Sequence, residues 1–115
     1  PFKLLDSDKG LPDTTPIENT TIGVVATNAG LDKATTNRLA SNAHDGLAMS
    51  VRPAHTPHDG DTFFALATGT HTPKVHLDRV LAATTLCVAR ATVRAIQQST
   101  GLAGIPSISE VKQHD

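Results

Sequence analysis

The sequence lacks most of the side chains that usually build a protein core, and it has no dominant charge. It contains no Trp or Tyr, only three Phe and one Cys among 115 residues. A single cysteine excludes an internal disulfide framework and a multi-cysteine zinc site. Ten Lys and Arg against eleven Asp and Glu give a formal net charge of −1, which provides no electrostatic basis for binding nucleic acid. No apolar run approaches the ~20 residues that span a bilayer, so neither a nucleic acid nor a membrane partner is predicted.

The start of the chain and its composition set two further expectations. Residues 1–6 lack the basic start and the long apolar stretch of a signal peptide, so a cytoplasmic location is expected. A single domain of this length buries roughly 65% of its unfolded surface, and here it must do so mainly with Ala, Val, Leu and Ile. That composition indicates a chain that forms part of something larger.

Apolar patterning predicts the order strand, helix, strand, helix, and therefore a mixed α/β (α+β) fold. Leu39, Ala43 and Leu47 fall on one face of the first helix. Thr72 and Pro73 are a typical start for the second helix. The predicted segments are a loop or tail over 1–19, a buried strand over 21–27, a helix over 31–50, a buried strand over 61–68, a turn over 69–71, a helix over 72–100 and a loosely ordered tail over 102–115.

A first candidate for chemistry is the Asn19-Thr20 pair, directly before the first strand. A Thr hydroxyl needs an adjacent base, and an N-terminal Thr carries one in its own α-amine, whose reference pKa is about 7.7 to 8. This chemistry requires a cut between Asn19 and Thr20, which Thr20 could make by attacking the Asn19 carbonyl. The alternative is that these residues only begin a strand.

A second candidate is the acidic segment Asp59-Gly60-Asp61, in the loop before the second strand. Two carboxylates separated by one Gly point the same way when the backbone is extended, and Gly lets another segment approach closely. Such a pair can orient an ammonium and a hydroxyl group. The alternative is a calcium-like or solvated acidic turn.

The histidines and the cysteine give weaker signals. His55 and His58 lie in a loop whose spacing fits no helix-based pair of metal ligands, so no metal and no cofactor is predicted. His44 borders the apolar face of the first helix and is expected to be a hydrogen-bonded structural histidine. Cys87 lies among apolar neighbours and is expected to be a small buried hydrophobe.

Taken together, these segments resemble the D-esterase/L-aminopeptidase (DmpA-like) family, which includes β-aminopeptidases and nylon-oligomer hydrolases. The likeness covers roughly residues 18–97. Its signatures are the self-cleavage junction Asn19-Thr20-Thr21-Ile22-Gly23-Val24-Val25-Ala26-Thr27-Asn28-Ala29, the helix and loop segments 43–48 and 53–56, and the second signature Asp59-Gly60-Asp61-Thr62-Phe63-Phe64-Ala65-Leu66-Ala67-Thr68-Gly69.

The resemblance implies a precursor that cuts itself and thereby exposes Thr20 as the catalytic nucleophile. Asn19 would end the preceding α chain, so that 1–19 is the tail of that chain and 20–115 is the β chain. Asp59 and Asp61 would be catalytic residues beside Thr20, and this Asp-Gly-Asp form with Thr resembles the nylon-oligomer hydrolases. The implied fold is a four-layer α/β/β/α sandwich completed by a missing N-terminal chain, in a homo-oligomer of αβ units.

The expected function is therefore amide-bond hydrolysis, on linear amides or peptides, through an acyl ester on Thr20. The enzyme would be competent only with its partner chain and would need no cofactor. Because two carboxylates favour the ammonium form of the Thr20 amine, one of them is expected to carry a proton or accept one. The alternatives are an acyltransferase of the ornithine-acetyltransferase type and a non-catalytic structural fragment.

Overall fold

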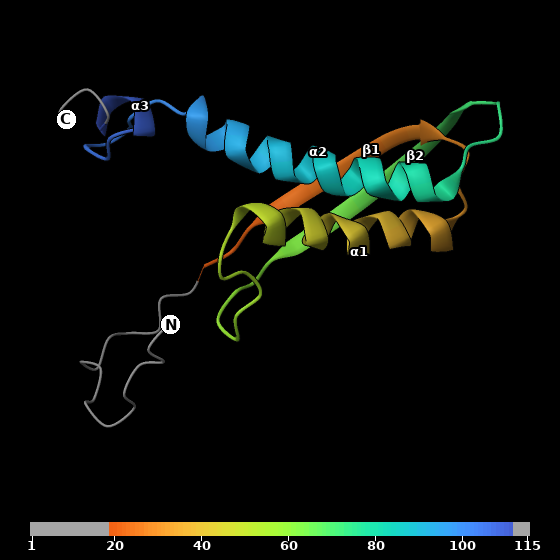
Figure 1. Cartoon of the computed structure of the whole chain (residues 1–115), viewed down its shortest axis with the longest axis horizontal. Helices are drawn as coiled ribbons and strands as arrows, with labels where there is room; N and C mark the ends of the chain where they lie inside the picture. The colour runs from red at the N-terminus through yellow and green to blue at the C-terminus, as the bar shows by residue number, and fades with distance from the viewer. Residues whose placement is uncertain (1–18, 112–115) are drawn as a thin grey trace, which may run out of the picture.

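The computed structural model describes residues 19–111, so 1–18 of the predicted N-terminal tail and 112–115 of the C-terminal one lie outside the described part. The predicted order of strand, helix, strand and helix is confirmed, and the fold is of the mixed helix and strand class (Figure 1). The elements are β1 (Ile22–Ala29), α1 (Lys33–Ser50), β2 (Thr62–His71), α2 (Leu77–Gln97) and α3 (Ile108–Val111).

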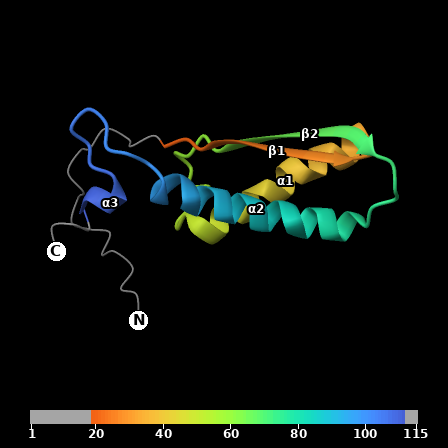
Figure 2. The same cartoon turned by 90° about the horizontal axis from the view of Figure 1, so that it is seen from above.

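The two strands form a parallel sheet, and both long helices lie on one side of it (Figure 2). The register runs from Ile22 opposite Thr62 to Thr27 opposite Ala67, with an irregularity before Ala29 pairs with His71. Because the strands are parallel, both begin at the same end of the sheet. The residues before β1 and the loop between α1 and β2 therefore meet there (Figure 1).

A small core forms between the helices and the sheet. Ala43, Leu47 and Val88 are its buried members, and Val25 and Phe63 pack against them from the strands. The predicted inward face of α1 is confirmed, since Leu39, Ala43 and Leu47 are all buried. α2 comes so close to α1 that a Cβ at Gly46 would collide with the Thr85 carbonyl and with Val88.

The other face of the sheet is apolar and exposed among the described residues. Ile22, Val24, Phe64 and Leu66 point to this face, with 47% to 72% of each residue exposed. The prediction of two buried strands is therefore wrong for residues 19–111, because the helices cover only one face. Apolar residues on both faces are typical of strands that have layers on both sides.

Several predicted boundaries also need correction. α1 begins two residues later than predicted, after Asp32, whose side chain accepts the Thr35 amide hydrogen at 2.7 Å. β2 continues to His71, so the predicted turn over 69–71 belongs to the strand. Residues 72–76 then cross to the helix layer, and α2 begins at Leu77 instead of following a Thr72 cap.

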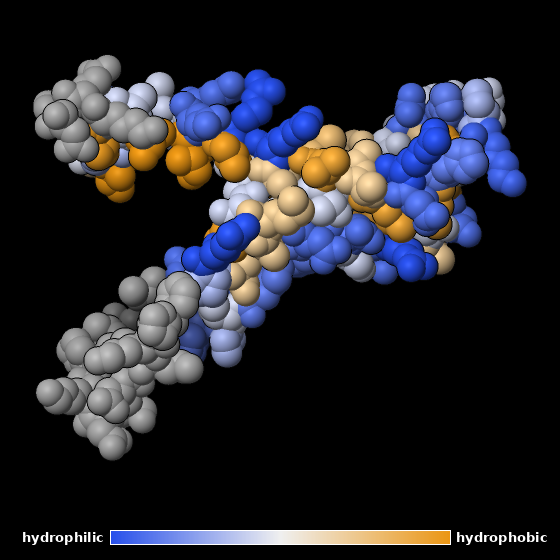
Figure 3. Space-filling model, viewed as in Figure 1, coloured by the Kyte–Doolittle hydropathy of each residue, from blue (hydrophilic) through white to orange (hydrophobic). Residues whose placement is uncertain are grey.

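Much of α2 is exposed, and the segment that follows it is more ordered than predicted. In α2, Thr84 and Val88 are buried, whereas Leu86, Val93 and Ile96 are exposed. Figure 3 shows apolar surface over α2 and the segment that follows it. That segment holds a bridge between Leu102 and Ile105 and the single turn α3, so the expectation of a loosely ordered tail is wrong over 102–111.

The length of α2 also corrects the expectation that no apolar segment approaches the length needed to span a bilayer. Judged by length and composition alone, α2 is long and apolar enough to cross a membrane, and it is the one such helix within residues 19–111. The helix nevertheless packs against α1, where Val88 joins the core of Ala43 and Leu47, and it carries Arg90 and Arg94 on its exposed side. The absence of a membrane partner stays a prediction.

Candidate active site

The main chain brings the two sequence candidates together at the start of the sheet. The Gly60 amide donates to the Asn19 carbonyl oxygen at 2.8 Å, and the Thr62 amide donates to the Thr21 carbonyl oxygen at 2.8 Å. Asn19 and Asp59 form an isolated parallel bridge. The junction 19–21 therefore lies alongside the acidic segment 59–61, as an extension of the β1–β2 pairing.

Gly60 lies directly against the side chain of Thr20. A Cβ added to Gly60 would stand 2.7 Å from Thr20 Oγ1, well inside van der Waals contact. Residues opposite one another in a sheet project to the same face, and successive residues alternate. The Thr20 side chain accordingly belongs to the exposed face, with Ile22 and Val24, rather than to the helix-covered face.

Asp61 is the most constrained acidic side chain of the site, with 8% of the side chain exposed. Its Oδ1 accepts the Thr21 amide hydrogen at 2.9 Å, and its Oδ2 lies 3.0 Å from Nδ1 of His55. Burial raises the pKa of Asp61, but hydrogen bonds from Thr21 and, after them, the influence of His55 outweigh it, so the pKa lies below its usual range. The Asp61 carboxylate is therefore ionised near neutral pH.

Asp59 holds the loop itself. Its Oδ2 accepts the Thr56 amide hydrogen at 2.7 Å, and its own amide donates to the Thr56 carbonyl at 3.0 Å. Within residues 19–111, neither acidic side chain is hydrogen-bonded to Thr20. In the uncut chain the Asp61 carboxylate thus holds Thr21, the Asp59 carboxylate holds the loop, and a direct contact of either with the Thr20 hydroxyl or amine stays a prediction.

His55 joins this site in a way that sequence reasoning missed. The sequence pattern gives His55 no metal site and no other role, yet its ring pairs with Asp61 and packs on the ring of His44. His58, three residues later, is exposed. Over residues 19–111, no group of three or more His, Cys, Asp or Glu could hold a metal ion. The sequence signal that could have identified His55 was its place in the same short loop as Asp59 and Asp61.

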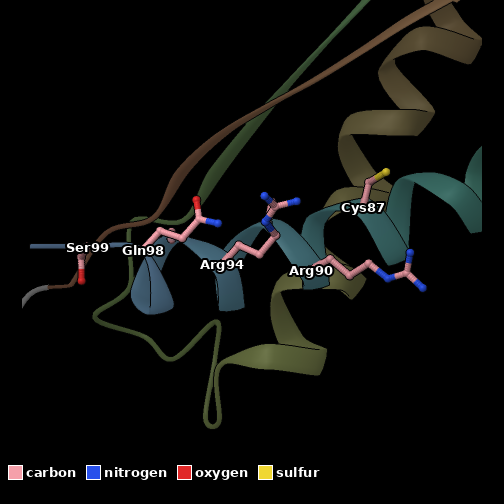
Figure 4. A pocket seen from close by; sticks show the side chains of 7 residues that line it. Cys87, Arg90, Arg94, Gln98 and Ser99 are labelled. Carbon is pink, nitrogen blue, oxygen red and sulfur yellow. The ribbon is translucent and has the colours of Figure 1, made fainter. Parts of the chain in front are cut away.

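A surface hollow away from this site lies along α2. It has a volume of about 590 Å³ and runs along one side of α2, where Cys87, Arg90 and Arg94 line it (Figure 4). Cys87 is exposed, so the prediction of a buried cysteine is wrong: α2 turns this side away from α1. A second, apolar groove of about 470 Å³ lies between β1 and α2 and begins at Thr21.

Comparison with known proteins places the chain in a peptidase family. The profile of peptidase family S58 matches residues 4–108. An uncharacterized aminopeptidase of Mycobacterium tuberculosis is 44% identical over 106 residues, which cover 81% of this chain and 31% of the relative. An uncharacterized aminopeptidase of Mycobacterium leprae is 48% identical over 102 residues, or 77% of this chain and 28% of the relative.

A 6-aminohexanoate-oligomer endohydrolase of Kocuria is also similar, with 38% identity over 58 residues, covering 50% of this chain and 16% of the relative. The chain thus spans about a third or less of the length of the relatives it matches.

Proposed function

The chain belongs to peptidase family S58, and on that premise we propose that it is the nucleophile-bearing C-terminal portion of a self-cleaving amide hydrolase. Thr20 is its nucleophile, and Asn19 ends the preceding chain. One observation carries the proposal: the Asn19-Thr20 bond lies beside Gly60, whose amide is bonded to the Asn19 carbonyl oxygen at 2.8 Å.

This contact suits the self-cleavage step. Thr20 Oγ attacks the Asn19 carbonyl carbon, and negative charge develops on the oxygen that already faces the Gly60 N–H. A preformed amide donor at this distance stabilises an oxyanion without reorganisation. The C–N bond then breaks, the hydroxyl proton passes to the leaving nitrogen, and an ester joins Asn19 to Thr20. Water hydrolyses the ester and leaves Thr20 with a free α-amine, the base that an N-terminal Thr nucleophile requires.

The exposed sheet face supports a partner layer. Thr20 belongs to the same face as Ile22, Val24, Phe64 and Leu66, all of which are exposed. A second sheet, contributed by the N-terminal chain of the same precursor, would bury these side chains and complete a four-layer α/β/β/α sandwich. The nucleophile then lies between the two sheets, which is where the partner chain can supply pocket walls. Association of αβ units into a homo-oligomer belongs to the same proposal.

The proposed substrates are linear amides or peptides. Names of similar proteins point in that direction, since two are aminopeptidases and one is a 6-aminohexanoate-oligomer endohydrolase. An amide substrate forms an acyl ester on Thr20 and releases its amine; water then releases the acid. No cofactor is needed for either step.

Intact-mass analysis of the precursor, expressed with the natural sequence upstream of Pro1, tests the proposal. We expect one species that begins at Thr20 and one that ends at Asn19, together with release of amine from aminoacyl anilides or oligoamides. Thr20→Ala should abolish both cleavage and turnover. Efficient cleavage in that variant would overturn the assignment, and transfer of the acyl group to an added amine in place of hydrolysis would identify an acyltransferase.

A further inference from the structure

We propose that His55 is a positioning residue for the nucleophile, because it holds the Asp61 carboxylate in the orientation that anchors Thr21. The inference rests on the proposed role of Thr20. The contacts form a short chain: Nδ1 of His55 lies 3.0 Å from Oδ2 of Asp61, and Oδ1 of Asp61 accepts the Thr21 amide hydrogen at 2.9 Å. His55 thus acts on Thr20 through two intermediaries.

The Asp61 carboxylate needs both contacts to fix its orientation. The terminal torsion of an Asp side chain is broad, so one hydrogen bond leaves the carboxylate free to rock. With one oxygen on His55 and the other on Thr21, that torsion is fixed. The Thr21 amide lies in the same peptide plane as the Cα of Thr20. Fixing this amide therefore fixes the direction from which Thr20 presents its hydroxyl.

The His55 ring is itself held by a row of aromatic rings. Its centroid lies 4.9 Å from that of His44, and the His44 centroid lies 5.0 Å from that of Phe63 in an edge-on arrangement. Nε2 of His55 also lies 3.4 Å from the His44 carbonyl oxygen. Phe63 occupies the space where a Cβ of Gly23 would stand. The row connects the loop to α1, β2 and β1, the elements that set the position of the junction.

The backbone at His55 agrees with an imposed position. Its φ is +59°, in the left-handed region that non-glycine residues adopt uncommonly and that surrounding contacts must maintain. This conformation turns the loop so that the ring reaches Asp61. His55 also contributes to keeping the pKa of Asp61 below its usual range despite burial.

The test compares two substitutions in the complete precursor. His55→Leu removes both ring nitrogens, whereas His55→Asn keeps a nitrogen donor near the place of Nδ1 and tolerates the left-handed region. We expect His55→Leu to slow cleavage at Asn19-Thr20 by about tenfold or more, and His55→Asn to restore most of the rate. His58→Leu, at the exposed histidine of the same loop, should cut at the parent rate.

A second measurement separates positioning from catalysis. In an uncut Thr20→Ala precursor, His55→Leu should increase hydrogen exchange at the Thr21 amide, and His55→Asn should not. Parent-like cleavage and exchange in His55→Leu would overturn the proposal, as would equal losses in the Leu and Asn variants or in His58→Leu. If the parent precursor never cuts, the proposed function fails, and the exchange at Thr21 still decides the role of His55.

Discussion

The amide of Gly60 and the carbonyl oxygen of Asn19 are joined by a 2.8 Å hydrogen bond across the start of the sheet. This bond places the scissile carbonyl of the proposed cleavage on a backbone donor that no substitution of Gly60 other than by proline removes. It forms because β1 and β2 are parallel and in register, so that the residues preceding each strand continue the pairing.

Gly60→Ala should impair self-cleavage. A Cβ at this position would stand 2.7 Å from Thr20 Oγ1, so the hydroxyl must rotate away from its present position. We expect cleavage to slow by about a hundredfold, which is the usual effect of moving a nucleophile out of its reactive position. Intact-mass time courses measure the rate. Gly30→Ala is the control, because the nearest atom to its Cβ would be 3.9 Å away; an equal loss there would contradict the argument.

In an uncut Thr20→Ala precursor, Asp61→Asn should make the free energy of unfolding depend less on pH in the acid range. The folded pKa of Asp61 lies below its unfolded value of about 3.9, so its ionised form stabilises the fold above that pH. This contribution is lost as the pH falls through the folded pKa. Unfolding in urea should therefore show a difference between parent and variant near neutral pH that vanishes in acid. The exposed Asp45→Asn variant should show a smaller dependence.

Phe64→Asp should weaken assembly with the N-terminal chain. Burying a Phe side chain contributes about 1.5–3 kcal/mol, and an Asp in its place would be an unpaired buried charge. We expect the affinity-tagged β chain to retain at least tenfold less of its partner after cleavage. Ser99→Asp, at an exposed position after α2, should retain the partner normally. Normal retention in Phe64→Asp would show that the exposed sheet face is not the interface.

Leu47→Ala should lower the free energy of unfolding by about 2–5 kcal/mol, since it opens a cavity in the core. Leu47 is 0% exposed and packs with Ala43 and Val88. The same substitution at Leu102, which is 81% exposed, should change stability little. Urea unfolding of the uncut precursor measures both variants. Comparable effects at the two positions would contradict the assignment of the core.

Local pattern predicted the elements well because the spacing of apolar residues reflects which face of a helix or strand is buried. The spacing of Leu39, Ala43 and Leu47 is that of one helical face, and this face is buried. The short apolar segments formed strands, although one face of each remains open. The end of β2 and the start of α2 were mispredicted because a longer-range contact decided them: Ala29 pairs with His71, so β2 extends further and α2 begins later.

The candidate site was partly predictable for a similar reason. Two short motifs identified Asn19, Thr20, Asp59 and Asp61, and the structure places the two segments side by side. His55 was missed as a partner of Asp61, because a loop histidine reveals nothing of its contacts until the loop is folded. Cys87 was misassigned because apolar neighbours along a helix do not tell which side faces the core.

Sequence alone was enough to predict the mixed fold, the order of its elements and the residues able to supply a nucleophile and carboxylates. Side-chain chemistry and local periodicity suffice for those conclusions. Tertiary structure alone decided which atoms meet: the parallel register brings the Gly60 amide to the Asn19 carbonyl, and the loop brings His55 to Asp61. Such contacts join residues far apart in the chain, and only folding sets the distance between them.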